Sequence, residues 1–215
     1  MTKKYEAVLF DFDGTIMNTN DIILESWQHT FRTVDGAERP FEDIAPTLGE
    51  PLRLTMSKFF PGRDPEDMVA IYRSYQQHVY QDRVHLFPGV KSVIQELKER
   101  GYRLGLVTSR LRDSTMEGLH KFGIAPYFDA VVTASDTDAH KPDPTPCHMC
   151  LDQLGVEPAD ALYVGDSKFD VLCARNAGVP FVLVGWSICV TDEQKEGIYK
   201  PDFHIDHPED LLQLV

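Results

Sequence analysis

The sequence holds little cysteine, few basic residues and no long apolar run. Its 215 residues include only 4 cysteines, whose irregular spacing excludes a disulfide scaffold and points to a reducing compartment. Lysine and arginine number 21 against 34 aspartate and glutamate residues, a formal net charge of -13 at pH 7. A chain this acidic repels polyanions, so we expect neither nucleic acid nor an anionic membrane surface as a partner.

Signals for export and for membrane insertion are also missing from the sequence. The first residues lead directly into an apolar stretch, without the hydrophobic segment and cleavage site of a signal peptide. No apolar run approaches the ~20 residues that a membrane-spanning helix needs. We therefore expect a cytoplasmic protein without membrane association, and the sequence leaves both monomer and homodimer open as assembly states.

A short apolar stretch near the N-terminus ends in two carboxylates. Residues 5–10 have the length and composition of a strand that is buried on both faces of a parallel sheet. Asp11 and Asp13 follow two positions apart, and Gly14 permits a turn close to a bound group. Two like charges this close favour a cation between them, and Mg²⁺ suits a site that also engages phosphate. Taken alone, the stretch is equally typical of a plain turn.

The chain has enough apolar residues, 42% of the total, to bury a sizeable core. Between residues 87 and 215 amphipathic helical segments alternate with short apolar strands, which is typical of a parallel sheet with helices on both faces. Residues 16–86 interrupt this alternation, because prolines and glycines divide them into short helical stretches. We predict an α/β, Rossmann-like core domain over residues 1–15 and 87–215, with an inserted small helical cap domain over residues 16–86.

Polar residues follow several of the expected strands. Thr108 and Ser109 end one strand, Asp166 ends another with Asp170 one helical turn later, and Lys141 lies in a proline-rich loop. Because the carboxyl ends of parallel strands meet at one edge of a sheet, we expect these residues to gather beside the first pair of carboxylates. Turn propensity alone does not explain so many reactive groups at successive strand ends. The inserted segment leaves and returns beside this edge, so we expect it to cover the site.

In chain order, four stretches resemble the motifs of the haloacid dehalogenase-like superfamily of phosphohydrolases, and the resemblance covers essentially the whole chain. The insertion after the first motif is similar to the mobile cap of the subgroup that contains phosphoglycolate phosphatases. Within that subgroup, residues 13–20, 185–187 and 200–203 are similar to bacterial pyrophosphatases. The four motif stretches are Asp11-Phe12-Asp13-Gly14-Thr15, Leu106-Val107-Thr108-Ser109, Lys141-Pro142-Asp143-Pro144 and Gly165-Asp166-Ser167-Lys168-Phe169-Asp170.

The resemblance implies a reaction through an aspartyl phosphate. Asp11 would be the nucleophile, and Asp13 would act as general acid to the leaving oxygen and then as general base to water. Mg²⁺ would be held by the carboxylates of Asp11 and Asp166 and by the backbone carbonyl of Asp13. Asp170 would be an auxiliary metal residue, and a helix N-terminal residue favoured by the dipole is the alternative for it.

Two other motifs would hold the transferred phosphoryl group. The resemblance implies that Thr108 hydrogen-bonds a phosphoryl oxygen, with Ser109 beside it on the substrate or backbone side. Lys141 would neutralise the transferred group and steady Asp11. Taken alone, the threonine is typical of a turn and the lysine of a solvated loop.

The substrate implied by the resemblance is a small phosphorylated metabolite. The acid at Asp13 favours phosphoester or phosphoanhydride cleavage, with inorganic pyrophosphate or phosphoglycolate first. A sugar phosphomutase of the β-phosphoglucomutase type is the alternative, and Leu52 counts against it because that family carries a phosphate-binding arginine there. We interpret Arg32, Arg53 and Lys58 of the cap as surface cations. We interpret the pair of cysteines at positions 147 and 150 as structural, because no second pair completes a zinc site.

Overall fold

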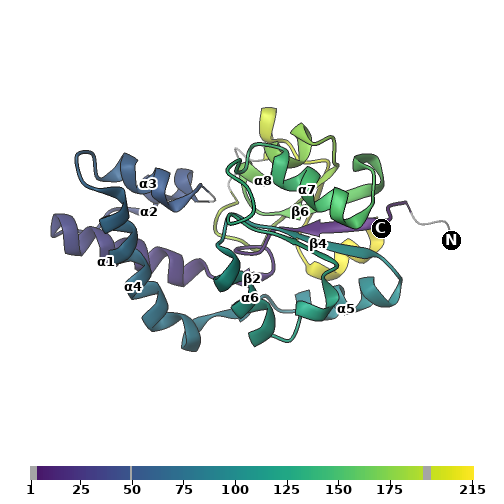
Figure 1. Cartoon of the computed structure of the whole chain (residues 1–215), viewed down its shortest axis with the longest axis horizontal. Coiled ribbons are helices and arrows are strands. Elements are labelled where there is room, and N and C mark those ends of the chain that lie inside the picture. Colours follow the sequence, from purple (N-terminus) through teal and green to yellow (C-terminus); the bar gives the residue numbers. More distant parts are fainter. Residues whose placement is uncertain (1–3, 49, 191–194) are drawn as a thin grey trace. The chain divides into compact units, whose positions relative to one another are not determined.

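The computed structural model describes residues 4–48, 50–190 and 195–215. The chain separates into two compact units, shown in Figure 1. The core unit comprises Met1–Met17 and Leu86–Val215, and the inserted unit comprises Asn18–His85. The core unit contains the segments predicted to form the α/β domain, and the inserted unit lies within the predicted insertion, with boundaries that differ by one or two residues.

The core unit is built on a six-stranded sheet in the order β5-β4-β1-β6-β7-β8. Each of its strand pairs is parallel, which confirms the predicted α/β fold class. β1 lies at the centre and is buried along its whole length, as its unbroken apolar composition predicts. The strands are β1 (Ala7–Phe10), β4 (Arg103–Val107), β5 (Ala130–Val132), β6 (Ala161–Gly165), β7 (Phe181–Val184) and β8 (Phe203–Ile205).

Helices follow the strands and cover both faces of the sheet, with α7 and α8 on one side and α5 on the other in Figure 1. In α5 the buried residues Val90, Val93, Ile94 and Leu97 recur at helical spacing, so one stripe of the helix packs inward. The α-helices of the core unit are α5 (Val90–Glu99), α6 (Arg112–Lys121), α7 (Thr145–Leu154), α8 (Lys168–Asn176) and α9 (Leu211–Leu214). Its 3-10 helices are η2 (Ala125–Tyr127), η3 (Pro158–Asp160), η5 (Gly197–Tyr199) and η6 (Pro208–Asp210).

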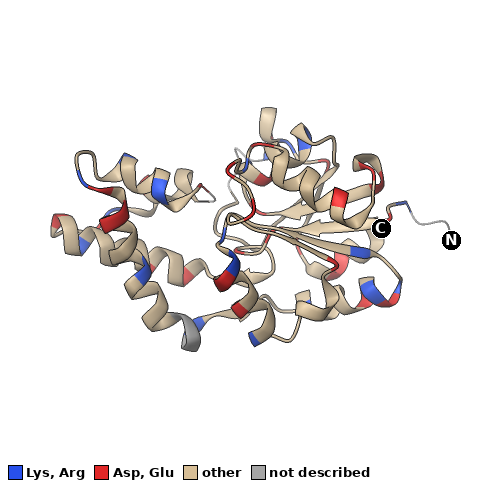
Figure 2. Cartoon of the chain, in the orientation of Figure 1, with Lys and Arg blue, Asp and Glu red and all other residues tan. Residues whose placement is uncertain are grey.

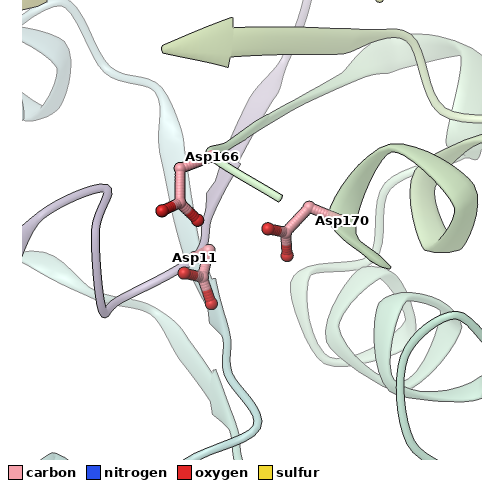
Figure 3. A group of neighbouring side chains, drawn as sticks. All are labelled: Asp11, Asp166 and Asp170. Atoms are coloured by element: carbon pink, nitrogen blue, oxygen red, sulfur yellow. The ribbon is translucent and has the colours of Figure 1, made fainter. Parts of the chain in front are cut away.

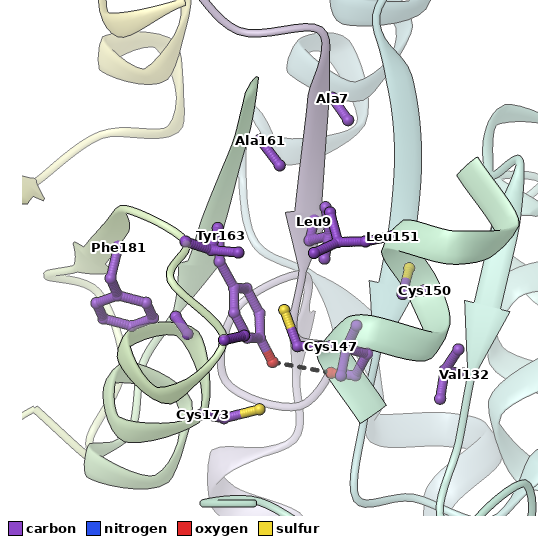
Figure 4. Close-up of a cluster of buried hydrophobic side chains, with 14 of the residues drawn as sticks. Ala7, Leu9, Val132, Cys147, Cys150, Leu151, Ala161, Tyr163, Cys173 and Phe181 are labelled. Carbon is purple, nitrogen blue, oxygen red and sulfur yellow. Dashed lines mark hydrogen bonds between the residues drawn. The ribbon is translucent and has the colours of Figure 1, made fainter. Parts of the chain in front are cut away.

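The cysteines of α7 belong to the main hydrophobic core (Figure 4). Cys147 and Cys150 are both fully buried, and they pack with Leu9 of β1 and Tyr163 of β6. Gly105 of β4 makes room for this packing, because a Cβ atom there would lie 2.4 Å from the Cys150 sulfur. The two thiols therefore act as small apolar groups between the sheet and α7.

The inserted unit is a helical bundle around a cluster of aromatic rings. The ring of Trp27 in α1 lies 5.5 Å from that of Phe31, 5.2 Å from that of Phe59 and 5.4 Å from that of Tyr72. These rings hold α1, α3 and α4 together through buried apolar area and edge-to-face contacts. The helices of the unit are α1 (Asn20–Asp35), α2 (Phe41–Ile44), η1 (Ala45–Thr47), α3 (Leu52–Phe59) and α4 (Pro65–Arg83).

The structure adds one feature that the sequence pattern did not predict. Two short strands, β2 (Met17–Asn18) and β3 (His85–Leu86), pair as a second sheet. Strands of two residues are too short to show an alternation of apolar and polar side chains, so the sequence pattern predicts only helices over residues 16–86. Within the described ranges, no helix combines the length and hydropathy that a transmembrane segment needs.

Candidate active site

A lysine from one loop and an aspartate from the central strand meet at the carboxyl edge of the sheet. Asp11 is the first residue after β1, and its backbone N–H donates to the Val164 carbonyl of β6 at 2.9 Å. Lys141 lies in the loop between β5 and α7, and its Nζ donates to Asp11 Oδ1 at 2.8 Å. Both side chains are buried, with relative exposures of 7% for Asp11 and 5% for Lys141. The predicted proximity of these two residues is therefore present in the structure.

Three buried carboxylates form the centre of the site (Figure 3). Asp166 follows β6, the neighbour of β1 in the sheet, and Asp170 lies in the first turn of α8. One oxygen from each of Asp11, Asp166 and Asp170 can be chosen so that all lie within 4.8 Å of one another. Carboxylate oxygens are the ligands that Mg²⁺ prefers, and a dication offsets the mutual repulsion of such a cluster. The donor set thus fits the metal implied by the sequence motifs.

Asp170 has a second set of contacts that the motif alone did not specify. Its Oδ2 accepts from the Ser167 backbone N–H at 3.0 Å and from the Ser167 hydroxyl at 2.5 Å, which completes a capping box at the start of α8. Its Oδ1 accepts from Lys141 Nζ at 2.6 Å and from the Tyr163 hydroxyl at 3.2 Å. Both oxygens are engaged, so Asp170 fixes the position of Lys141 and caps the helix at once.

Burial and like charges shift the ionisation of these groups. Burial raises the pKa of the Asp11 carboxyl well above its ordinary value of 3.8, although Lys141 acts in the opposite direction. Burial also raises the pKa of Asp166 to about 7, and repulsion from Asp170 adds to the rise. Burial acts to lower the pKa of Lys141, but attraction to its two carboxylate partners outweighs this and raises it above 10.5. The lysine therefore stays charged, and a bound cation would favour the ionised form of Asp166.

The loop that follows β7 supports Asp166. The Ser187 hydroxyl donates to Asp166 Oδ2, and Trp186 beside it donates from Nε1 to the Thr15 carbonyl at 3.1 Å. Gly14 leaves space for the Asp166 carboxylate, because a Cβ atom at Gly14 would lie 2.0 Å from Oδ2. Gly14 also has a φ of 81°, a conformation that glycine adopts at little cost. The spacing of Ser187 and Asp166 in the sequence does not indicate that the two residues share a hydrogen bond.

Asp13 is not one of the three clustered carboxylates and pairs with an arginine. Arg110 Nη1 donates to Asp13 Oδ1 at 3.0 Å, and the side chains are 12% and 27% exposed respectively. Arg110 is the residue after the Thr108-Ser109 motif, but no role was assigned to it from the sequence. Its ion pair with Asp13 is the main contact of the site that sequence reasoning missed.

Thr108 and Ser109 lie at the same edge of the sheet, at the end of β4. Thr108 is 5% exposed, and its backbone N–H donates to the Val132 carbonyl of β5 at 3.0 Å. Its Oγ1 accepts from the Arg110 backbone N–H at 3.2 Å. Ser109 is partly buried beside it. The threonine hydroxyl is thereby fixed in a turn next to β1, where its proton can be donated to a bound oxyanion.

The inserted unit carries the cations that were interpreted as surface charges. Figure 2 shows basic and acidic residues interspersed over its helices. Leu52 is the first residue of α3. The three cations form ion pairs and remain exposed, so each is satisfied without a ligand. The pairs are Arg32 with Glu38, Arg53 with Glu66, and Lys58 with Glu50.

The sequence is similar to those of known hydrolases along nearly its whole length. Residues 8–184 match the haloacid dehalogenase-like hydrolase family. The chain belongs to this family. Pyrophosphatase PpaX of Bacillus velezensis is 36% identical over 212 residues, which cover 99% of this chain and 97% of the relative. Pyrophosphatase PpaX of Bacillus cereus is 35% identical over 212 residues, with 99% and 97% covered.

Solved structures agree with the family assignment. A candidate phosphoglycolate phosphatase from Lactobacillus plantarum superimposes with a TM-score of 0.87 at 26% identity, covering 99% of this chain and all (100%) of that one. A haloacid dehalogenase-like family protein from Streptococcus pneumoniae has a TM-score of 0.85 at 24% identity, which shows the same fold. The chain is thus a haloacid dehalogenase-like phosphohydrolase, and the resemblance drawn from its four motifs is confirmed.

Proposed function

We propose that this phosphohydrolase cleaves inorganic pyrophosphate through a phosphoryl group carried transiently on Asp11. The observation that carries the proposal is the buried contact of Lys141 with Asp11, beside Asp166 and Asp170. Several relatives that are at least 35% identical over almost the whole chain are named pyrophosphatases, which supports this substrate. Phosphoglycolate is the second candidate, favoured by the Lactobacillus plantarum structure.

In the first half of the reaction Asp11 would attack the phosphorus atom. A bond forms between a carboxylate oxygen of Asp11 and phosphorus, and the bond from phosphorus to the leaving oxygen breaks. In its protonated form Asp13 would give the proton on Oδ2 to the leaving oxygen, while its Oδ1 accepts from Arg110. Lys141 would offset the charge of the transferred group, and the Thr108 hydroxyl and Ser109 would position its oxygens. An alkoxide leaving group depends on the proton from Asp13 more than a leaving phosphate does.

In the second half water would replace the aspartate. Asp13, now ionised, would take a proton from a water molecule as its oxygen attacks the phosphorus. The bond between Asp11 and phosphorus breaks, phosphate leaves, and both aspartates return to their starting states. Asp13 therefore acts as acid and then as base, and its carboxylate has to stay within hydrogen-bond reach of both oxygens.

The metal proposed for the site is Mg²⁺. The carboxylates of Asp11 and Asp166 and the backbone carbonyl of Asp13 would hold it, and Asp170 would contribute by orienting Lys141. When bound, the dication offsets the repulsion between the anionic nucleophile and the anionic phosphate and orients both. Burial raises the pKa of Asp11 and Asp166. A dication would counter this rise, because it stabilises the ionised carboxylates.

We propose that the protein acts in the cytoplasm and that residues 16–86 form a cap that selects the substrate. The chain enters this segment directly after the loop that carries Asp11 and Asp13, a connection typical of lids that close over a reacting group. The proposal extends to a small phosphorylated metabolite as the partner, to a protein that binds neither nucleic acid nor membranes, and to a monomer or homodimer.

Phosphate release from a panel of substrates tests the function. The panel comprises pyrophosphate, phosphoglycolate, sugar phosphates and nucleotides, each with Mg²⁺ and with a chelator. We expect release from pyrophosphate in the presence of Mg²⁺, loss with chelator, and loss in Asp11→Asn. A sugar phosphomutase would instead need a sugar bisphosphate activator and release little phosphate. Unchanged phosphate release in Asp11→Asn would show that the assignment of the nucleophile is wrong.

A further inference from the structure

We propose that Arg110 is a positioning residue. It holds Asp13, the acid and base of the reaction, at the leaving-group side of the site. This proposal rests on the proposed function, in which Asp13 transfers the proton. The proposal explains how Asp13 is oriented, which the contacts within the three-carboxylate cluster do not explain. Asp13 is not a member of that cluster.

The geometry of the pair supports the assignment. Arg110 Nη1 lies 3.0 Å from Asp13 Oδ1, across 97 positions in the chain. The arginine side chain is only 12% exposed. Ion pairs between exposed side chains contribute little to stability, and the pair of Arg53 with Glu66, 69% and 65% exposed, is of that kind. The pair with Asp13 is more enclosed and engages the one carboxylate that has to move a proton.

Arg110 is itself held at three points within the core unit. Its Nε donates to the Ser114 hydroxyl at 3.1 Å, and its backbone N–H donates to Thr108 Oγ1 at 3.2 Å. Its carbonyl accepts from the Ala134 N–H at 3.0 Å. The guanidinium therefore reaches Asp13 from a fixed base. A lysine could not bond Ser114 and Asp13 at once with the same planar fork, which explains why this position holds arginine.

Positioning matters because proton transfer requires hydrogen-bond contact. A general acid has to lie about 2.6–3.2 Å from the atom that it protonates, and a misplacement of about 1 Å can cost ~100-fold in rate. The side chain of Asp13 is 27% exposed, and an aspartate side chain has several staggered rotamers to choose between. Arg110 removes this freedom before the substrate arrives.

The alternative is that Arg110 acts on the substrate directly, by binding the negative charge of the leaving group. The two roles predict different coupling between mutations. If Arg110 acts through Asp13, its replacement has no further effect once Asp13 has lost its acid. If Arg110 binds the substrate, the two losses add.

A double-mutant cycle tests the proposal with Arg110→Met, Asp13→Asn and the double variant. The parameter is kcat/KM, because it reports the steps up to departure of the leaving group. Two substrates are compared: phosphoglycolate, whose alkoxide needs a proton, and p-nitrophenyl phosphate, whose leaving group does not. We expect Arg110→Met to lower kcat/KM for phosphoglycolate by ~10- to 100-fold and for p-nitrophenyl phosphate by much less. In the Asp13→Asn background we expect no further loss.

Controls separate this role from a loss of folding. Arg100→Met removes an exposed ion pair with Glu96 at the end of α5, next to the amino end of β4 and therefore at the opposite edge of the sheet. This variant is expected to leave kcat/KM unchanged for both substrates. Arg110→Lys keeps the charge without the fork and should restore only part of the activity; it also replaces Arg110→Met in the cycle if that variant does not fold.

Equal losses on both substrates, additive losses in the double variant, or unchanged kinetics in Arg110→Met would each overturn the positioning role. Failure of the proposed function has a different signature. If Asp13→Asn itself has no effect on phosphoglycolate, the proton-transfer role of Asp13 is wrong. If Asp13→Asn is impaired and Arg110→Met is not, only the role of Arg110 fails.

Discussion

Lys141 Nζ lies 2.8 Å from Asp11 Oδ1, although 130 positions separate the two residues in the chain. The same ammonium group contacts Asp170 at 2.6 Å, so one cation serves two buried carboxylates. Asp166 is the third carboxylate of the cluster, and when all three are ionised their negative charge exceeds the single positive charge of Lys141. This imbalance supports the Mg²⁺ proposed for the site, because a dication would offset it before an anionic substrate binds.

Replacing Lys141 is expected to affect activity and stability together. In Lys141→Met we expect phosphate release to fall by ~10²–10³-fold, as when another preorganised charge contact is removed. The unfolding free energy should fall by ~3 kcal/mol, because Asp11 and Asp170 lose their buried partner. Steady-state kinetics and chemical denaturation measure the two effects.

Lys200 offers a matched control for this experiment. It is also followed by proline and aspartate, but its side chain is exposed and it precedes β8. Lys200→Met should change neither quantity. Equal effects of the two replacements would contradict a specific role for Lys141.

Ser187 is expected to tune metal affinity through Asp166. Its hydroxyl donates to Asp166 Oδ2, and Ser187 is 7% exposed. Loss of a hydrogen bond to a metal ligand typically weakens metal binding by about 10- to 100-fold. In Ser187→Ala the Mg²⁺ concentration that gives half of the maximal thermal stabilisation should rise by about that factor. Ser57→Ala, on the exposed face of α3, serves as the control, and an identical Mg²⁺ titration in both variants would exclude the role.

The rise in Tm on adding Mg²⁺ should increase with pH. The pKa of Asp166 is about 7 in the folded chain against an ordinary value of 3.8, so the folded state binds more protons than the unfolded state between these limits. Without metal, the contribution of Asp166 to stability therefore decreases as pH rises through this window. Mg²⁺ binds the ionised carboxylate, so the rise in Tm on adding Mg²⁺ should be larger at about pH 8 than at about pH 5.5.

Asp166→Asn provides the control for the pH dependence, because it cannot ionise. In this variant the Tm response to Mg²⁺ should be small and nearly independent of pH. A wild-type response that is as large at the acidic pH as at the alkaline one would contradict the assignment of Asp166 as a ligand that has to lose a proton.

Local pattern predicted the strands and the residues that end them. Asp11 and Asp166 follow β1 and β6, and these strands are parallel neighbours, so their side chains meet as expected. Asp170 was predicted as a residue near the metal with a helix-terminal alternative. The Ser-x-x-Asp spacing from Ser167 could have shown its role as part of a capping box, which proved to coexist with a contact to Lys141.

Contacts between distant loops could not be predicted. Arg110 and Asp13 are 97 positions apart, and Ser187 and Asp166 belong to loops after different strands. No periodicity or spacing connects such pairs, because their meeting depends on the order of strands in the sheet. No sequence pattern distinguishes Arg110 from the exposed arginines of the inserted unit. Only the fold distinguishes a cation paired with a carboxylate of the candidate site from one on the surface.

The central claim is that Asp11 carries the phosphoryl group, and chemical trapping of the phosphorylated enzyme tests it most directly. Asp13→Asn lacks the base for hydrolysis, so the intermediate should accumulate when this variant reacts with p-nitrophenyl phosphate and Mg²⁺. Borohydride reduces an aspartyl phosphate to homoserine, which mass spectrometry of the peptides locates. We predict homoserine at position 11 and at no other aspartate. Homoserine elsewhere, or release of p-nitrophenol with Asp11 unmodified, would contradict the account.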